Sequence, residues 1–281
     1  MNIQQSLVEA QEILKEAGID SYKLDAETLL FELLNIDKAG YYKDPKRELS
    51  STEQQDFHNL LKKRVKREPV AKIIGKKEFY SLEFLTSQAT LDPRPDTETL
   101  IDTARKHLNN ENKLDILELG TGTGCIIITL LKYFKVSRGT SVDISTEALN
   151  IAHQNAKKHQ LLERLTLLES NMFEKVDSEY DLIISNPPYI DKAEILELEP
   201  EVKDYDPILA LDGGTDGLDF YREIAQTSKI YLKENGLVIL EIGCTQQKSV
   251  TEIFKKEGFF LEESKHDLAG LARCLVFKQK A

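Results

Sequence analysis

The run Asn186-Pro187-Pro188-Tyr189 carries the most evident chemistry in this sequence. It directly follows 180–185, an apolar run with the length and composition of a buried strand. Two consecutive prolines cannot continue a helix or donate to a sheet ladder, so the chain must leave the strand in a stiff turn. An amide oxygen, a carbonyl and an aromatic ring are thereby fixed past a strand's carboxyl end, where open α/β sheets bind ligands. This set could hold a planar NH2 group, and a purely structural turn is the alternative.

A glycine-rich loop, Gly120-Thr121-Gly122-Thr123-Gly124, separates an expected strand at 115–119 from an apolar helix at 125–134. Glycine lets the backbone approach a ligand closely. The spacing differs from the GxGxxG dinucleotide fingerprint because the third glycine comes one residue early, so it makes no strong case for a pyrophosphate. With the acidic Glu118 before it, the loop suits a cationic or zwitterionic ligand such as S-adenosylmethionine. A structural glycine turn is the other interpretation.

Three further positions could complete a nucleoside site. Asp143 ends the second expected strand, where a carboxylate can accept both ribose hydroxyls. Asp143 could instead cap the next helix, a role for which Ser145 competes, but beside the glycine loop we prefer ribose binding. Asn171 and Met172 follow the third strand, where an amide can pair with an adenine edge and Met172 or Phe173 can pack on its face. Core packing is an equal alternative for Phe173.

The elements that must position these residues change character along the chain. Residues 1–67 show three helical patterns and no strand alternation, and the third pattern opens at Ser51, whose spacing to Gln54 resembles a capping box. We therefore expect a helical bundle over 1–70, followed by a β-hairpin connector over 71–92 that includes 70–75 among its extended runs. Pro93 and Pro95 then stiffen the chain, and Asp96 is the expected N-cap of a helix over 97–108.

From residue 113 onward the pattern becomes strand, loop, helix, repeated. Alternating β and α units predict a parallel sheet with right-handed crossovers, so 93–281 is expected to form an α/β domain. The expected strands after the first end at Asp143, at Leu168, at Ser185 and at Ile242. The end of the chain predicts two further strands around a turn.

Composition limits the class of protein. The net charge of −11 argues against bulk nucleic acid as the main partner, because phosphate binding needs clustered cations. No apolar run approaches the roughly 18 residues of a membrane span. Cys125, Cys244 and Cys274 are widely spaced and odd in number, which favours reduced thiols in a cytoplasmic protein over disulfides or a metal site. We expect no metal, no membrane partner and no stable nucleic-acid partner.

The sequence contains one local cluster of basic residues although its net charge is negative. Its members are Lys62, Lys63, Arg64, Lys66, Arg67, Lys72, Lys76 and Lys77. The interpretation we favour is the solvated end of a helix, where the macrodipole prefers positive charge. A docking patch for an acidic protein surface or for RNA is the alternative.

The motifs together resemble the HemK/PrmC family, the release-factor glutamine methyltransferases. The glycine loop with Glu118 and the run 186–190 are similar to class I methyltransferases that act on a planar nitrogen, and the likeness covers essentially the whole chain. The further matching segments are Pro93-Arg94-Pro95-Asp96-Thr97-Glu98, 198–202, 209–214, 216–218, Leu240-Glu241-Ile242-Gly243 and 267–270. The family shows Asp and often an aromatic residue where this chain has Asn171 and Met172, Glu-Pro where it has 206–207, and Arg-Asp-Arg where it has 271–273.

The resemblance implies a Rossmann-like, seven-stranded, mostly parallel class I fold that uses S-adenosyl-L-methionine. It implies as substrate the glutamine of the Gly-Gly-Gln motif in class 1 peptide release factors, methylated at N5, with the helical domain recognising that partner. Asn186, Pro187 and Tyr189 are the implied catalytic residues, and Pro188 completes the substrate site. The implied cofactor contacts are Gly120, Thr121, Gly122, Thr123, Gly124, Asp143, Asn171, Met172 and Asn186.

Two other functions remain open from the residues. A base edge and an amide share the planar NH2, so N6-adenine or another amino group of DNA or RNA is an alternative substrate. The acidity and the lack of an evident target-recognition domain count against it. A non-catalytic module that keeps the fold is the third hypothesis, and the intact glycine loop, Asp143 and Asn186 argue against it.

Overall fold

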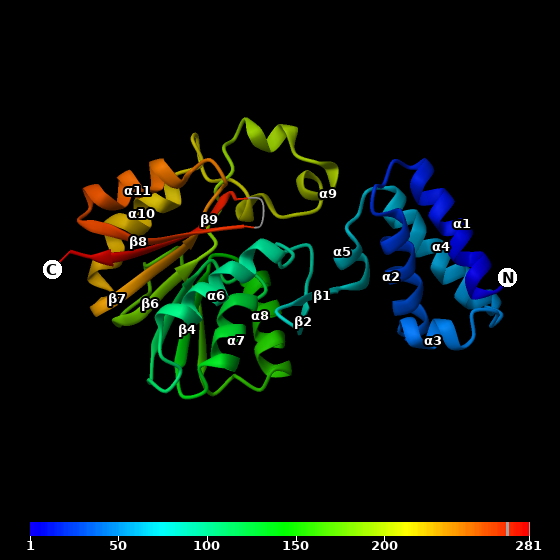
Figure 1. Cartoon of the computed structure of the whole chain (residues 1–281), viewed down its shortest axis with the longest axis horizontal. Helices are drawn as coiled ribbons and strands as arrows, with labels where there is room; N and C mark the ends of the chain where they lie inside the picture. Colours follow the sequence, from blue (N-terminus) through cyan, green and yellow to red (C-terminus); the bar gives the residue numbers. More distant parts are fainter. Residues whose placement is uncertain (268–269, 281) are drawn as a thin grey trace. The chain divides into compact units, whose positions relative to one another are not determined.

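The computed structural model describes residues 1–267 and 270–280 (Figure 1). Contacts divide the chain into two compact units. The smaller unit comprises Met1–Lys76 and Pro200–Tyr205, and the larger comprises Lys77–Glu199 and Asp206–Ala281. The short segment 200–205 therefore belongs to the smaller unit although its sequence neighbours belong to the larger. In the described part of the chain, no helix has the length and apolarity to cross a membrane.

The smaller unit is helical, as the sequence predicts. Its core gathers apolar residues from the first, second and fourth helices, including Ile3, Leu7, Leu14, Leu29 and Phe57. The spacing of three and four residues within α1 places its apolar side chains on one face. The helices are α1 (Ile3–Glu16), α2 (Tyr22–Leu34), α3 (Lys38–Lys43), α4 (Ser51–Val65), α5 (Val70–Ile74) and α9 (Pro200–Lys203).

Local expectations in this unit need three corrections. The capping box of α4 is formed by Ser50 and Glu53, one residue earlier than Ser51 and Gln54, because Ser50 has the extended backbone that an N-cap requires. The run 70–75 is helix α5 rather than part of the hairpin, since Pro69 starts it and Gly75 ends it at a φ of 76°. Helix α3, capped by Asp37, carries no clear apolar period and was not expected.

The cation cluster is also not a uniformly solvated helix end, because Arg64 is buried. Its Nε donates to Asp25 Oδ2 at 2.7 Å, and its Nη1 and Nη2 lie 3.1 Å from Glu201 Oε1 in α9. Arg67 Nε also contacts Glu201 Oε1 at 2.9 Å, and Tyr205 Oη donates to the Lys66 carbonyl at 2.7 Å. These bonds attach segment 200–205 to the bundle and leave only part of the cluster to solvent.

The larger unit is built on a seven-stranded sheet of order β5-β4-β3-β6-β7-β9-β8. The strands β3 to β7 run parallel, and β9 is antiparallel to both of its neighbours. The predicted seven-stranded, mostly parallel class I fold is therefore confirmed. The strands are β3 (Asp115–Leu119), β4 (Arg138–Asp143), β5 (Leu165–Glu169), β6 (Tyr180–Ser185), β7 (Leu232–Glu241), β8 (Phe259–His266) and β9 (Ala272–Gln279).

Helices cover both faces of this sheet. Figure 1 shows α6 (Glu98–His107), α7 (Cys125–Tyr133) and α8 (Thr146–Lys158) on one face. It shows α10 (Asp219–Thr227) and α11 (Gln247–Lys256) on the other. Two apolar clusters result, with Ile116 of β3 in the first and Leu117 and Leu119 in the second. This alternation follows from the two-residue side-chain period of a strand.

Short elements complete the larger unit. The expected hairpin is β1 (Lys76–Phe79) with β2 (Leu82–Leu85). Asp96 does not cap a helix: a 3-10 turn, η1 (Pro95–Thr97), leads directly into α6, and Asp96 instead lies 3.3 Å from Arg273. The remaining 3-10 turns are η2 (Glu194–Glu197), η3 (Ile208–Ala210) and η4 (Ser228–Ile230).

Candidate active site

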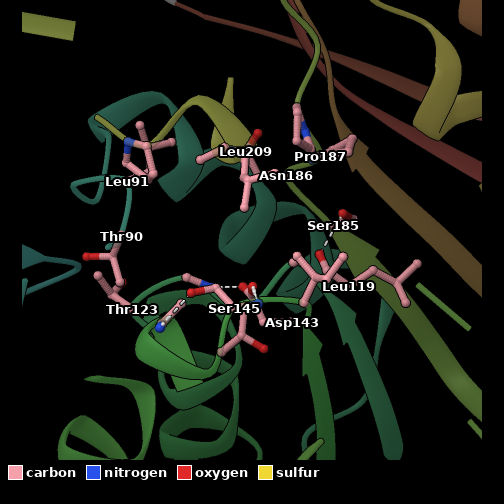
Figure 2. Close-up of a pocket in the computed structure, with 18 of the residues that line it drawn as sticks. Thr90, Leu91, Leu119, Thr123, Asp143, Ser145, Ser185, Asn186, Pro187 and Leu209 are labelled. Atoms are coloured by element: carbon pink, nitrogen blue, oxygen red, sulfur yellow. Dashed lines mark hydrogen bonds between the residues drawn. The ribbon is translucent and has the colours of Figure 1, made fainter. Parts of the chain in front are cut away.

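A cavity of about 270 Å³ opens at the carboxyl ends of β3, β4 and β6. The strand order reverses between β3 and β6, which is the switch point where open α/β sheets bind ligands. In Figure 2, Asp143 and Ser145 lie on one side of the cavity, opposite Leu209 and Asn186, with Thr90 and Leu91 at one end. The cavity therefore brings the glycine loop, the acidic strand end and the Asn-Pro-Pro turn together.

The glycine loop forms one wall of this cavity. Gly120 and Gly122 line it with φ values of 75° and 53°, a region that glycine favours. A Cβ added at either position would meet no atom within 4 Å, so both face open space that a ligand can fill. Thr121 and Thr123 also line the cavity. Gly124 does not, because it begins α7, where its Cβ would meet Ile128 and Ala152.

Asp143 lies where the sequence predicts it, at the end of β4 and in the cavity wall. Its Oδ2 accepts from the Gly122 N–H at 2.8 Å and its Oδ1 accepts from the Ser145 N–H at 2.9 Å. The helix cap is Ser145, whose Oγ accepts from the Ala148 N–H, so Asp143 is not the cap. Each carboxylate oxygen keeps capacity for one more donor, which suits a pair of ribose hydroxyls.

Glu118 is fully buried behind the loop and is not a lining residue. Ser141 Oγ donates to its Oε2, and Ser141 in turn contacts Thr121 Oγ1 at 2.6 Å. Its Oε1 has no partner among the described residues. Burial raises the pKa of this carboxyl to about 8, against the lowering effect of the Ser141 bond. Glu118 thus reaches the cavity through Ser141 and Thr121.

Asn171 and Met172 line the cavity beside Asp143, whose carbonyl accepts from the Ser170 N–H at 3.0 Å. Ser170 Oγ accepts from the Lys175 N–H at 3.0 Å and fixes this turn. Phe173 does not line the cavity: its ring stacks on Tyr231 at 5.2 Å in the core, the alternative that the sequence had left open.

The Asn-Pro-Pro turn is held from several sides. Ser185 Oγ donates to the Leu119 carbonyl at 2.7 Å, which ties the end of β6 to β3. Asn186 Nδ2 donates to Thr97 Oγ1 at 3.1 Å. Asn186, Pro187 and Pro188 all line the cavity. Asn186 therefore stands beside the same space as the glycine loop.

Tyr189 differs from its three predecessors. It is half-buried, packs against the second apolar cluster and is not a lining residue of the cavity. Its carbonyl accepts from Gln246 Nε2 at 2.9 Å, and burial raises the pKa of its hydroxyl well above the usual range. It supports the turn from behind.

Several lining residues were not singled out from the sequence as site residues. Ile144 is 56% exposed and lines the cavity directly after Asp143, which an exposed apolar residue at a strand end could have signalled. Thr97, Leu209 and Phe220 also line it. Thr97 and Leu209 fall in the family segments 93–98 and 209–214, a signal that could have marked them. Of the family segment 267–270, Leu268 and Ala269 lie outside the described residues.

The described residues include no cluster of His, Cys, Asp and Glu that could hold a metal ion, and the three cysteines are free. The residues that line the cavity do fit S-adenosylmethionine. They provide open glycine positions, a carboxylate that can accept further hydrogen bonds, and an apolar wall at Ile144 and Met172. An open seven-stranded sheet of this order with a glycine loop after its first strand is the fold of the class I methyltransferases.

Family models match both units. A model described as the PrmC N-terminal domain matches residues 5–75, and one described as the methyltransferase small domain matches residues 78–199. A release factor glutamine methyltransferase of Agrobacterium fabrum is 38% identical, over 97% of this chain and 96% of that protein. The chain belongs to the release factor glutamine methyltransferase family, which confirms the resemblance inferred from the motifs.

Two further similarities extend this result. A bifunctional methyltransferase of Rickettsia felis is 37% identical over 98% of this chain but only 58% of its own length, so the chain spans little more than half of that longer protein. The crystal structure of a ribosomal protein L11 methylase from Lactobacillus delbrueckii subsp. bulgaricus has a TM-score of 0.51 at 21% identity. It covers 68% of this chain and 84% of that one, and it supports the fold.

Proposed function

We propose that this protein transfers the methyl group of S-adenosyl-L-methionine to the side-chain amide nitrogen, N5, of the glutamine in the Gly-Gly-Gln motif of class 1 peptide release factors. The observation that carries the proposal is the position of Asn186 in the same cavity as the glycine loop and Asp143. The similarity to release factor glutamine methyltransferases supports the choice of substrate. Such a modification would serve translation termination.

The roles of the cavity residues follow from their chemistry. Gly120 to Thr123 would receive the cofactor's methionine part, and Gly124 would support the loop as the start of α7. Asp143 would accept the ribose hydroxyls, and Asn171 and Met172 would meet the adenine. When bound, the cofactor supplies an electrophilic sulfonium methyl.

The substrate side needs no strong base before attack. An amide nitrogen is a poor nucleophile because its lone pair is delocalised into the carbonyl. Asn186 Oδ1 and the Pro187 carbonyl would accept its two N–H bonds, hold it in line and favour pyramidalisation, and positioning of this kind supplies about 7–11 kcal/mol. The two oriented acceptors would also stabilise positive charge developing on nitrogen. Pro188 would stiffen the site, and Tyr189 would back it and exclude water.

The partner and compartment belong to the same proposal. The helical domain at 1–70, joined through the connector at 71–92 to the catalytic domain at 93–281, would recognise the release factor. The enzyme would act in the cytoplasm, and its three free cysteines suit a reducing compartment. No membrane and no stable nucleic-acid partner would be needed.

The test incubates the protein with S-adenosylmethionine and a purified class 1 release factor and maps methylation by mass spectrometry. We expect one methyl group on the Gly-Gly-Gln glutamine, and none on a release factor with Gln→Ala at that position. Asn186→Ala should abolish transfer while cofactor affinity, measured by calorimetry, stays nearly unchanged. Methylation that persists on the Gln→Ala substrate, or methyl transfer to DNA or RNA instead, would overturn the assignment.

A further inference from the structure

Two family segments to which the proposed reaction assigns no role each place a side chain next to Asn186. Thr97 comes from the segment 93–98, and Glu241 comes from the segment 240–243. Asn186 Nδ2 donates to Thr97 Oγ1 at 3.1 Å. Both side chains lie near the Glu241 carboxyl and lower its pKa. Thr97 and Asn186 line the cavity, whereas Glu241 does not.

The sheet register explains why Glu241 lies there. Parallel strands β6 and β7 pair Ser185 with Leu240, so the next residues along the two strands are Asn186 and Glu241. Tyr221 Oη donates to the Glu241 carbonyl at 2.9 Å and fixes the backbone at this point. The contact between the two side chains is therefore set by the fold rather than by a flexible loop.

Burying the Glu241 carboxyl lowers the stability of the folded protein. Glu241 is 3% exposed, and its Oε2 has no partner among the described residues. The polar side chains beside it that favour its ionised form are those of Thr97 and Asn186. A buried carboxylate with so few bonds lowers the stability of a fold, so a stabilising role does not account for it.

We propose that Glu241 and Thr97 are positioning residues that fix the rotation of the Asn186 amide, so that its NH2 group points inward and its oxygen points to the substrate nitrogen. The inference rests on the proposed function, in which Asn186 Oδ1 accepts a substrate N–H. An amide without such partners can turn by 180° about its terminal torsion, since the two orientations have similar shape. In the turned orientation the NH2 group of Asn186 would face the NH2 group of the substrate glutamine, and no oxygen would be there to accept its hydrogen bond.

The charge of Glu241 decides how firmly this orientation is held. An ionised carboxylate only accepts hydrogen bonds and therefore selects the NH2 of Asn186, whereas a protonated carboxyl can donate to the amide oxygen and select the opposite rotation. Burial raises the pKa of Glu241 to about 7, and hydrogen bonds from Thr97 and Asn186 lower it. The other ionisable groups around it are Asp96, Arg273, Tyr189, Tyr221, Cys125 and Cys274.

The first experiment reads the amide directly by NMR, without any substrate. The Asn186 side-chain NH2 signals, assigned by their loss in Asn186→Asp, should titrate in the wild type with a midpoint near pH 7. Glu241→Gln and Thr97→Val should shift these signals, and Glu241→Gln should remove the titration. Glu223→Gln is the matched control, because burial also raises the pKa of this half-buried carboxyl although it does not line the cavity. Unchanged Asn186 signals in both variants would overturn the inference.

The second experiment measures methyl transfer to the release factor. Glu241→Gln should lower kcat about 10- to 100-fold, as a misplaced reacting group does, and leave cofactor affinity unchanged. Wild-type kcat should rise as pH increases through about 7, and Glu241→Gln should lose this dependence. Thr97→Ser should keep activity because it keeps the hydroxyl. If wild-type protein shows the NMR signature but methylates no release factor, the proposed function fails and the positioning role stands. If the wild type methylates the release factor and Glu241→Gln shows normal kinetics, the proposed function stands and the positioning role fails.

Discussion

The Asp143 carboxylate accepts a hydrogen bond from the Gly122 N–H at 2.8 Å, so the expected ribose acceptor and the glycine loop form one structure. The two are 21 residues apart in the sequence and follow neighbouring parallel strands, β3 and β4. The same carboxylate also accepts from the Ser145 N–H at the start of α8. Two backbone segments around the cavity, the glycine loop and the start of α8, are thus held by a single side chain.

Asp143→Ala should weaken cofactor binding about 10- to 100-fold, because it removes hydrogen bonds to a charged group worth about 1.5–3 kcal/mol and frees the loop. Isothermal titration calorimetry with S-adenosylmethionine measures the loss. Glu169→Gln is the matched control: Glu169 ends β5 beside Asp143 in the register but is exposed and does not line the cavity. Equal affinity for Asp143→Ala and the wild type would contradict the ribose assignment.

Gly213→Ala should disable the Asn-Pro-Pro turn. A Cβ at this position would lie 2.8 Å from Tyr189 Cα and 2.9 Å from the Pro188 carbonyl oxygen, and backbone atoms cannot move aside cheaply. The Gly213 N–H also donates to the Ile190 carbonyl at 2.8 Å, so the displaced segment leads directly from the turn. We expect kcat for methyl transfer to fall about 100-fold.

Cofactor affinity should remain near the wild-type value in Gly213→Ala, since the glycine loop and Asp143 are not displaced. Gly40→Ala serves as the control, because the three atoms nearest to its Cβ would belong to the side chains of Ile36 and Asp37, at 3.3 Å or more, and not to the backbone. A Gly213→Ala enzyme with normal kcat would show that the turn tolerates displacement and is not the reacting site.

Arg64→Met should loosen segment 200–205 from the smaller unit. The Arg64 side chain is 6% exposed and contacts both Asp25 and Glu201, so its removal leaves Asp25 without this cation and leaves Glu201 with Arg67. Breaking a buried pair in this way costs about 3–5 kcal/mol. Hydrogen exchange of the backbone amides in α9 and α2 should speed up, whereas Lys63→Met, at an exposed neighbour, should leave exchange unchanged. Unchanged exchange in Arg64→Met would mean that other contacts hold the segment.

The sequence predicts the parallel sheet well because the signal there is local. The central strands β3 and β6 are mostly apolar runs that end just before the glycine loop and just before Asn186, and their side chains are buried on both sheet faces. Because these residues follow the carboxyl ends of parallel strands, the sequence also predicts that the glycine loop, Asp143 and Asn186 lie at one edge of the sheet. The structure places all three at the same cavity.

Two kinds of feature could not be predicted from the sequence. One is a contact between residues far apart in the chain, and the other is the choice between two adjacent residues of the same type. Glu241 comes beside Asn186 through the register of β6 and β7, and Arg64 bonds to Asp25 and to Glu201, which are 39 and 137 residues away in the sequence. Ser50 and Ser51 are equally good N-caps by type, and backbone conformation alone selects Ser50.

Glu118→Gln should stabilise the protein at alkaline pH. Burial raises the pKa of the folded-state carboxyl to about 8 from 4.5, so between these values the folded state holds a proton that the unfolded state has released. Stability therefore falls as pH rises through this window, by an amount on the order of 2–4 kcal/mol for this group. Glutamine stays neutral and should remove that loss.

Thermal unfolding at pH 5 and at pH 8.5 measures the effect. The gain in Tm of Glu118→Gln over the wild type should be small at pH 5 and largest at pH 8.5. Glu241 contributes a loss of the same sign, with a pKa of about 7, but it is present in both proteins and cancels in the difference. Glu234→Gln, at an exposed position of β7, should show no such pH-dependent gain. A gain of equal size at both pH values would mean that Glu118 is already ionised in the folded protein, held by Ser141 rather than neutralised by burial.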